Sequence, residues 1–402
     1  MPFDYIPPLL HPSQSKIVLL VLDGLGGLPL NAGGLTELEA AHTPIMDRLA
    51  VEGTLGQVTP IRAGITPGSG PAHLALFGYD PIHYEIGRGV LESVGVGLQV
   101  KSGDVAARGN FCTLDKNGNI SDRRAGRIST EEALPLVDKI AKVSIPGVNT
   151  EVRHVKEYRF AVVMRGDGLD PDIDDTDPQR TGVPPLKPEA RTSAAVHTAD
   201  LFNKWIAEAR AALSNEAKAN GMTLRGFSSD PKLPTFNDSY GLNAAAISVY
   251  PMYKGVASLV GMQVIQFPGE TPEDEFSALA EVWDEYDFFF IHIKKTDSKG
   301  EDGDFDGKAK VIEVVDNALP RLLDLNPDVL IITGDHSTPA KLRTHSWHPV
   351  PFLLWAPHTA RPDDRTSFGE QACARGGLGD FPSMNTLPLA LAHANRIDKF
   401  GA

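Results

Sequence analysis

An uninterrupted run of branched aliphatic residues, Ile17–Leu22, is the feature that most limits what this chain can fold into. Such a run suits a central strand of a parallel sheet that is buried on both faces. Similar apolar runs occur near 245–250, 288–293, 329–333 and 351–355, and helical patterns lie between them, for example at 273–285 and 308–323. This alternation predicts a doubly wound α/β core with a mostly parallel sheet.

The stretch 97–186 breaks the rhythm of long strands and helices. Its apolar runs are short and alternating, and glycine, proline and aspartate separate them. We therefore expect a smaller α+β domain here, inserted into a core made of 1–96 and 187–402. The acidic segment Asp170–Pro178 lacks the glycine and the terminal glutamate of an EF-hand, so a solvated or substrate-facing loop is expected there instead of a calcium site.

Composition excludes several classes of partner. The formal charge is -14 over 402 residues, which argues against binding to nucleic acid or to an anionic membrane. No apolar run approaches the ~20 residues of a membrane-spanning helix, and 1–15 lacks the pattern of an export signal. Two cysteines, Cys112 and Cys373, exclude a disulfide framework and a cysteine zinc site. We expect a cytoplasmic protein, and its oligomeric state is left open.

The motif Gly334-Asp-His-Ser-Thr-Pro339 directly follows the apolar run 329–333. An aspartate and a histidine at the carboxyl end of a strand offer an oxygen and a nitrogen ligand to a divalent metal. A further histidine, His345, lies one short loop away. The same residue types also suit a plain turn with a helix cap, so both interpretations stay open at this point.

Two more carboxylates follow predicted strands. Asp23 ends the first strand, and Asp297 lies in the loop after the run 288–293. Because the carboxyl ends of parallel strands share one edge of the sheet, both side chains are expected to face Asp335 and His336. The acidic residues between Asp297 and Asp304 also fit a solvated loop.

Ser69 stands in a turn flanked by glycines, before a helical segment that contains His73. At a helix N-terminus the backbone N–H groups favour an anion, and a nearby metal would lower the hydroxyl pKa enough to make a nucleophile. A serine without chemistry at the helix start is the alternative. His73 fits either a proton shuttle or a packed helix histidine.

Taken together, these blocks resemble the alkaline phosphatase superfamily and, within it, the archaeal-type cofactor-independent phosphoglycerate mutases. The matching blocks in the core are Asp23-Gly24, Pro67–Ser69, His73–Pro81, Lys295–Asp297, Gly334–Pro339 and His345. Those in the insertion are Gly87–Gly89, Asn110-Phe111, Asp122–Arg127, Arg165–Gly168 and Asp175–Pro178.

The resemblance implies an alkaline phosphatase-like core and two divalent metals. Manganese is expected first, with magnesium, cobalt and zinc as alternatives, and no bisphosphoglycerate is needed. Carried over to this chain, one metal is bound by Asp23, Ser69, Asp335 and His336, and the other by Asp297 and His345. Glu301 stands where many relatives have a histidine. A carboxylate there suits manganese or magnesium, with Asp302 as the other candidate, so the second site is the less certain one.

The resemblance also implies that the insertion is a substrate-binding cap. Phosphate and carboxylate groups call for planar, multidentate cations, and Arg123, Arg127 and Arg165 are the candidates. Asp122 is expected to orient an arginine or the glycerate hydroxyl, and Lys254 resembles a phosphate-contacting lysine of the family. Asn110 completes the expected substrate contacts. A cap that closes over the metals would keep water from a phosphorylated serine.

The expected function is an isomerase of glycolysis that interconverts 3-phosphoglycerate and 2-phosphoglycerate. Ser69 would carry the phosphoryl group, with Asp122, Arg123 and His73 assisting. One alternative is a metal-dependent phosphohydrolase, or a phosphotransferase to a small acceptor such as homoserine. The other, suggested by Glu301 alone, is a catalytically inactive relative that binds a ligand.

Overall fold

In the computed structural model, which describes residues 4–401, the chain divides into two compact units. The first contains Met1–Glu85, Leu233–Tyr250 and Ala257–Ala402, and the second contains Ile86–Lys232 and Pro251–Val256. No helix among residues 4–401 is long and apolar enough to cross a membrane.

The first unit is built on an eight-stranded sheet. Its strands run in the order β13 (Gly379–Pro382), β2 (Thr54–Thr59), β12 (Val350–Trp355), β11 (Val329–Thr333), β1 (Ile17–Leu22), β10 (Phe288–Ile293), β8 (Ala244–Ser248) and β9 (Gln263–Val264). Only β12 runs against its neighbours; every other pair in the sheet is parallel. The predicted α/β fold with a mostly parallel sheet is confirmed.

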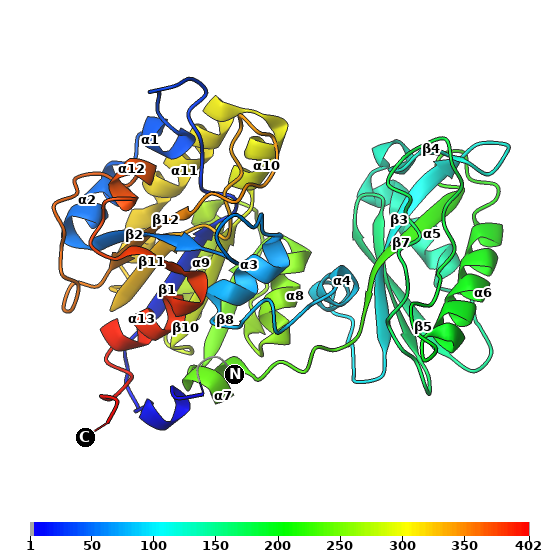
Figure 1. Cartoon of the computed structure of the whole chain (residues 1–402), viewed down its shortest axis with the longest axis horizontal. Coiled ribbons are helices and arrows are strands. Elements are labelled where there is room, and N and C mark those ends of the chain that lie inside the picture. Colours follow the sequence, from blue (N-terminus) through cyan, green and yellow to red (C-terminus); the bar gives the residue numbers. More distant parts are fainter. Residues whose placement is uncertain (1–3, 402) are drawn as a thin grey trace. The chain divides into compact units, whose positions relative to one another are not determined.

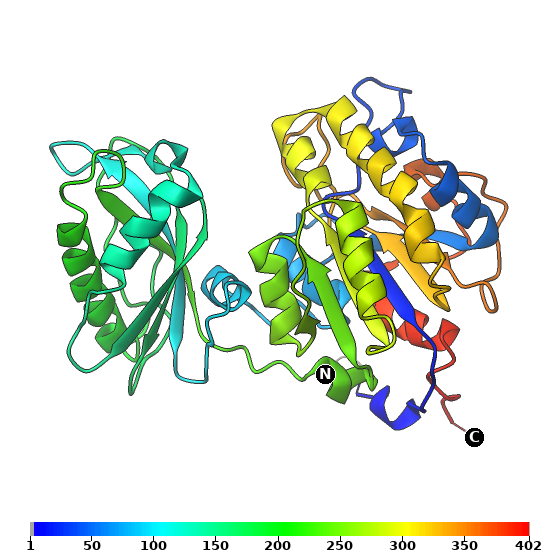
Figure 2. The same cartoon turned by 180° about the vertical axis from the view of Figure 1, so that it is seen from behind.

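Helices cover both faces of this sheet. Figure 1 shows α3 and α13 in front of it, and Figure 2 shows α9 and α11, in yellow-green and yellow, on the opposite face. The helices of this unit are α1 (Glu37–Ala40), α2 (Pro44–Glu52), α3 (Ser69–Leu76), α7 (Phe236–Tyr240), α9 (Pro272–Glu281), α10 (Lys295–Asp302), α11 (Phe305–Leu323), α12 (Glu370–Cys373) and α13 (Thr386–His393), with the 3-10 turns η1 (Pro7–Leu9) and η3 (Ser383–Asn385). Because both faces are covered, β1, β8, β10 and β11 are buried along their whole length.

The second unit is a five-stranded antiparallel sheet with helices. Strands β4, β3, β6 and β5 are adjacent in that order, and β7 pairs with β3. Its elements are α4 (Arg88–Gly95), β3 (Val105–Leu114), β4 (Ile120–Asp122), η2 (Ala125–Arg127), α5 (Thr130–Ile140), β5 (Asn149–Lys156), β6 (Arg159–Arg165), α6 (Val196–Ala212) and β7 (Gly221–Ser228). Helix α8 (Pro251–Leu259) begins in this unit and ends in the first.

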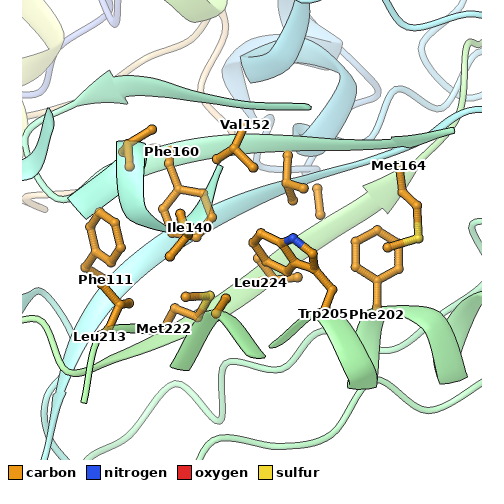
Figure 3. Close-up of a cluster of buried hydrophobic side chains, with 14 of the residues drawn as sticks. Phe111, Ile140, Val152, Phe160, Met164, Phe202, Trp205, Leu213, Met222 and Leu224 are labelled. Carbon is orange, nitrogen blue, oxygen red and sulfur yellow. The ribbon is translucent and has the colours of Figure 1, made fainter. Parts of the chain in front are cut away.

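The second unit is larger than the insertion 97–186 that the sequence predicted. Strand β7 pairs with β3 over Gly221–Ser228, and α6 contributes Phe202 and Trp205 to the hydrophobic core of the unit. Figure 3 shows both side chains packed among residues from the sheet, such as Phe160 and Leu224. Residues 187–232 therefore belong to this unit and not to the core domain, because its sheet and its hydrophobic core need them.

Candidate metal centre

The ends of three adjacent strands bring the predicted ligands together. In the parallel registers Val21 lies beside Thr333, and Leu22 lies beside Ile293, so β1, β11 and β10 end at the same level. Asp23 follows the first strand, Asp335 and His336 follow the second, and Asp297 follows the third. All four are buried. Asp297 lies in the first turn of α10, where the sequence predicted a loop.

One group of possible metal ligands consists of Asp23, Asp335 and His336, whose ligand atoms lie within 4.8 Å of one another. Asp335 Oδ1 accepts hydrogen bonds of 3.0 Å from the backbone N–H groups of Gly24 and His336. Its Oδ2 is buried and accepts no hydrogen bond from the described residues. A buried carboxylate oxygen without a donor is costly, and a divalent cation would satisfy it. The donor set therefore fits a metal.

A second group consists of Asp297, His336 and His345. The rings of His336 and His345 stack with centroids 3.6 Å apart. Nδ1 of His345 lies 3.0 Å from the carbonyl oxygen of Pro67. If this nitrogen carries the proton and donates to Pro67, Nε2 is free to bind a metal. The sequence assigned His336 to one site only, whereas the two groups share it.

Glu301 lies at the rim of the second group. Its Oε1 is 4.0 Å from Nε2 of His345, and its side chain is 57% exposed. Partial burial, followed by the nearby carboxylate of Asp297, raises the pKa of Glu301. The expected role of Glu301 as a ligand stays a prediction, since it belongs to neither compact group.

The charged side chains around the two groups shift the pKa values of Asp23 and Asp335 in opposite directions. The ammonium of Lys294 lies 3.0 Å from Asp23 Oδ2 and 2.5 Å from Asp297 Oδ2. Burial alone would raise the pKa of Asp23, but Lys294 and then His292 hold it well below its ordinary value. Burial and the charge of Asp23 raise the pKa of Asp335 well above its ordinary value. A divalent cation would reverse the effect on Asp335.

Ser69 is the first residue of α3 and is nearly buried. Its Oγ lies 3.1 Å from Nε2 of His336, the residue that the two ligand groups share. The first backbone N–H groups of an α-helix have no partner within the helix and favour an anion at the helix start. A hydroxyl in this position can attack an anionic phosphoryl group that is held between the helix start and the metal ligands.

The surroundings of His73 favour the packed-histidine interpretation over a proton shuttle. Its Nδ1 lies 2.8 Å from the carbonyl oxygen of Ser69, one helical turn back, and the side chain is fully buried. Burial, followed by the nearby ring of His292, lowers the pKa of His73 to about 3. A neutral imidazole that is closed off from solvent holds the start of α3 in place.

Three residues near the ligands were missed by the sequence reasoning. The Thr338 hydroxyl donates to Asp297 Oδ1 at 2.7 Å and lies 2.9 Å from Nδ1 of His336. It therefore accepts from a protonated Nδ1, which leaves Nε2 of His336 to face Ser69. His292 Nε2 lies 3.2 Å from Asp23. Lys294 contacts Asp23 and Asp297, as described above. The visible signal for His292 was a histidine inside the apolar run 288–293.

In the second unit, Asp122 accepts hydrogen bonds from two backbone N–H groups that are close to it in sequence. Its Oδ1 accepts from the N–H of Arg124 at 2.7 Å, and its Oδ2 accepts from the N–H of Gly126 at 2.8 Å. It thus stabilises a turn in which Ala125, Gly126 and Arg127 all have positive φ. These hydrogen bonds explain why an aspartate stands at the start of this turn. The catalytic role expected of Asp122 stays a prediction.

The arginines of the second unit fall into separate networks. Arg123 binds Asp177 with two hydrogen bonds of 3.1 and 2.8 Å, and Arg225, which the sequence reasoning missed, lies 3.6 Å from the same carboxylate. Arg165 instead contacts Asp104, Glu151 and the carbonyl of Gln99. The paired guanidinium groups of Arg123 and Arg225 are the better candidate for an anion site.

Two further predicted contacts lie in the same unit. The amide oxygen of Asn110 accepts hydrogen bonds from Arg108 at 3.3 and 3.2 Å, which leaves its NH₂ group for another partner. Partial burial lowers the pKa of Lys254. Their roles in substrate binding stay predictions.

Comparison with known proteins identifies the family. The family model for 2,3-bisphosphoglycerate-independent phosphoglycerate mutase matches residues 50–218. A probable mutase of this kind from Thermus thermophilus is 52% identical over 100% of this chain and 99% of its own length. One from Aquifex aeolicus is 50% identical over 99% of this chain and 100% of its own length.

Solved structures agree with this assignment. A protein from Pyrococcus horikoshii is 32% identical and superposes with a TM-score of 0.83, covering 96% of this chain and 99% of that one. The cofactor-independent phosphoglycerate mutase of Thermoplasma acidophilum is 29% identical with a TM-score of 0.71, covering 94% and 100%. The chain belongs to the family of 2,3-bisphosphoglycerate-independent phosphoglycerate mutases.

Proposed function

We propose that the protein interconverts 3-phosphoglycerate and 2-phosphoglycerate without bisphosphoglycerate, through a phosphorylated Ser69. Family membership supports the reaction, and the 3.1 Å approach of Ser69 Oγ to Nε2 of His336 supports the nucleophile. The contact places Ser69, the only serine of α3, against His336, the side chain that both ligand groups share.

The residues divide the work as follows. Asp23, Asp335 and His336 would hold one divalent metal, and Asp297 and His345 the other, with His336 between them. Bound metals would supply positive charge for the phosphoryl oxygens and lower the pKa of the serine hydroxyl. We take both metals to be manganese, because carboxylate and imidazole ligands suit it.

The phosphoryl group moves to Ser69 in a first step and back to glycerate in a second. Ser69 loses its proton, its Oγ forms a bond to phosphorus, and the bond from phosphorus to the 3-oxygen of glycerate breaks while that oxygen gains a proton. The 2-hydroxyl of the same glycerate then loses its proton and its oxygen forms a bond to phosphorus, while the bond from phosphorus to Ser69 Oγ breaks and Oγ regains a proton. The N–H groups at the start of α3 would stabilise the transferring group.

The glycerate carboxylate needs a cationic partner throughout both steps, so that the molecule can turn without leaving. Arg123 suits this task, because its bidentate contact with Asp177 fixes the plane of its guanidinium group. We assign the second unit the role of the substrate-binding cap on this ground. With two buried free cysteines, the protein suits a reducing, cytoplasmic location.

The test is an enolase-coupled assay with 3-phosphoglycerate and manganese, with free phosphate measured in parallel. Coupled turnover without phosphate release supports a mutase. Phosphate release in place of 2-phosphoglycerate would identify a phosphohydrolase, and phosphate transfer to an added acceptor would identify a phosphotransferase. A chain that binds less than one metal and stays inactive with added manganese would be an inactive relative.

A further inference from the structure

Lys308 is a fully buried lysine behind the metal ligands, and neither the predicted ligand sets nor the proposed reaction uses it. It projects from α11, which is drawn in yellow in Figure 2. Its ammonium donates hydrogen bonds to the carbonyl oxygens of Gly24 at 2.8 Å, Gly26 at 3.0 Å and Thr338 at 2.9 Å. Since an ammonium has three N–H groups, these bonds use its whole donor capacity.

The three acceptors lie in the two loops that carry the first ligand group. Gly24 and Gly26 follow Asp23, and Thr338 follows Asp335 and His336. The backbone N–H of Thr338 also bonds the carbonyls of Gly24 at 3.2 Å and Gly26 at 3.0 Å. Lys308 therefore lies at a junction where the two ligand loops touch, and its ammonium bonds to both.

The buried carboxylate of Glu37 binds the same two loops a few residues after the contacts of Lys308. Glu37 accepts from the N–H of Leu28 at 3.1 Å and from the N–H of Ala340 at 2.6 Å. It is fully buried; burial lowers the pKa of the Lys308 ammonium, and the charge of Glu37 opposes that shift. Lys308 and Glu37, two buried side chains of opposite charge, thus hold the two loops together at neighbouring positions along the chain.

Fold stability alone does not account for a charged residue in this place. Burying an ammonium is costly, and buried charges can often be replaced by apolar residues of the same shape without loss of stability. Lys308 offers two things that an apolar residue lacks. It ties the carbonyls of both loops, and it places a positive charge within electrostatic reach of the carboxylates of Asp23 and Asp297.

We propose that Lys308 is a positioning residue of the metal centre, which fixes Asp23 relative to Asp335 and His336 before any metal binds. The inference rests on the proposed metal centre and deepens it. It predicts that the loss of Lys308 weakens metal binding by more than the accompanying loss of stability explains, since misplaced ligands must first be ordered by the metal.

The experiment is calorimetric titration of the metal-stripped full chain with Mn²⁺, together with thermal unfolding of each metal-free protein. Lys308→Met keeps an unbranched side chain that is one atom shorter, and it removes the donors and the charge. The expected result is Mn²⁺ affinity lower by roughly 10- to 100-fold, as for other residues that orient metal ligands. Lys308→Gln, which keeps two donors, should fall between Lys308→Met and the wild type.

Two controls separate positioning from stability. Lys310→Met makes the same substitution two residues later at an exposed site and should leave Mn²⁺ affinity unchanged. Leu319→Ala removes buried side-chain atoms from the same helix about 16 Å further along. It should lower the unfolding temperature without weakening Mn²⁺ binding.

Wild-type affinity in Lys308→Met, or equal weakening in a Leu319→Ala protein of the same stability, would overturn the proposal. Failure of both Lys308 variants to fold would make Lys308 a purely structural residue and would also overturn it. If the wild type itself binds no Mn²⁺, the proposed metal centre is wrong and the inference falls with it.

Discussion

The imidazole rings of His336 and His345 stack with their centroids 3.6 Å apart. His336 belongs to both ligand groups, whereas His345 belongs to only one. The two proposed metal sites therefore share a side chain, and occupation of one site is expected to affect the other.

Substitutions of these two histidines should have different effects on metal content. His336→Ala removes a ligand from both groups and should leave less than one tightly bound Mn²⁺ per chain. His345→Ala should leave about one, because Asp23, Asp335 and His336 stay intact. Metal analysis after dialysis measures this difference. The exposed His83→Ala is the control, and equal losses in the two variants would contradict the sharing of His336.

Thr338→Val tests the hydroxyl that connects Asp297 with His336. Valine has nearly the same shape, so the change removes the donor to Asp297 and the acceptor for Nδ1 of His336. We expect Mn²⁺ affinity and kcat to fall by roughly 10- to 100-fold. Calorimetry and the coupled assay measure the two effects. Thr359→Val, at an exposed site, should change neither, and an unaffected Thr338→Val protein would show that the hydroxyl is dispensable.

Glu370 should make stability depend on pH. Burial, opposed in part by hydrogen bonds from Thr36 and from the N–H of Gly27, raises the pKa of Glu370 to about 7. A raised pKa means that the folded state holds the proton more tightly than the unfolded state. The contribution of Glu370 to the stability of the folded state is therefore complete below about pH 4.5, the ordinary pKa of a glutamate, and is lost as the pH rises through 7.

The measurement is the unfolding temperature of the metal-free protein between pH 5 and pH 8, where the wild type should lose more stability than Glu370→Gln. Glu281→Gln, which alters an exposed carboxylate at the end of α9, should keep the wild-type slope. Parallel pH profiles for wild type and Glu370→Gln would refute the raised pKa.

Arg123→Lys tests the anion site of the second unit. Lysine keeps the charge but cannot make the two parallel hydrogen bonds to Asp177. We expect kcat/KM for 3-phosphoglycerate to fall roughly 10- to 100-fold, while Mn²⁺ binding stays at the wild-type level. The matched control is Arg124→Lys in the same turn. If Arg124→Lys lowers kcat/KM as much as Arg123→Lys, the assignment of Arg123 is wrong.

The sequence predicted the parts of the site that stand at the ends of long apolar runs. Asp23, Asp335 and His336 follow strands whose buried character is plain in the sequence, and strands that end at one level bring them together. The shared role of His336 was missed because it depends on ring direction and not on chain order. The same holds for Lys308, which reaches the ligand loops from a helix between them in sequence.

The boundary of the second unit was missed for another reason. Strand β7 pairs with β3, more than a hundred residues earlier, and its Gly221 and Gly226 interrupt the apolar pattern that marks a strand. Helix α6 is amphipathic, and nothing local tells which sheet it covers. Only long-range pairing assigns 187–232 to the second unit.

The most direct test of the account is to find where the phosphoryl group resides during turnover. Wild type with Mn²⁺ and 3-phosphoglycerate is quenched in acid, and the peptide that contains Ser69 is analysed by mass spectrometry. We predict a phosphoserine at Ser69, and neither phosphopeptide nor turnover in Ser69→Ala, while Ser277→Ala, a control on helix α9, behaves as wild type. A Ser69→Ala protein that still interconverts the two phosphoglycerates would contradict the central claim.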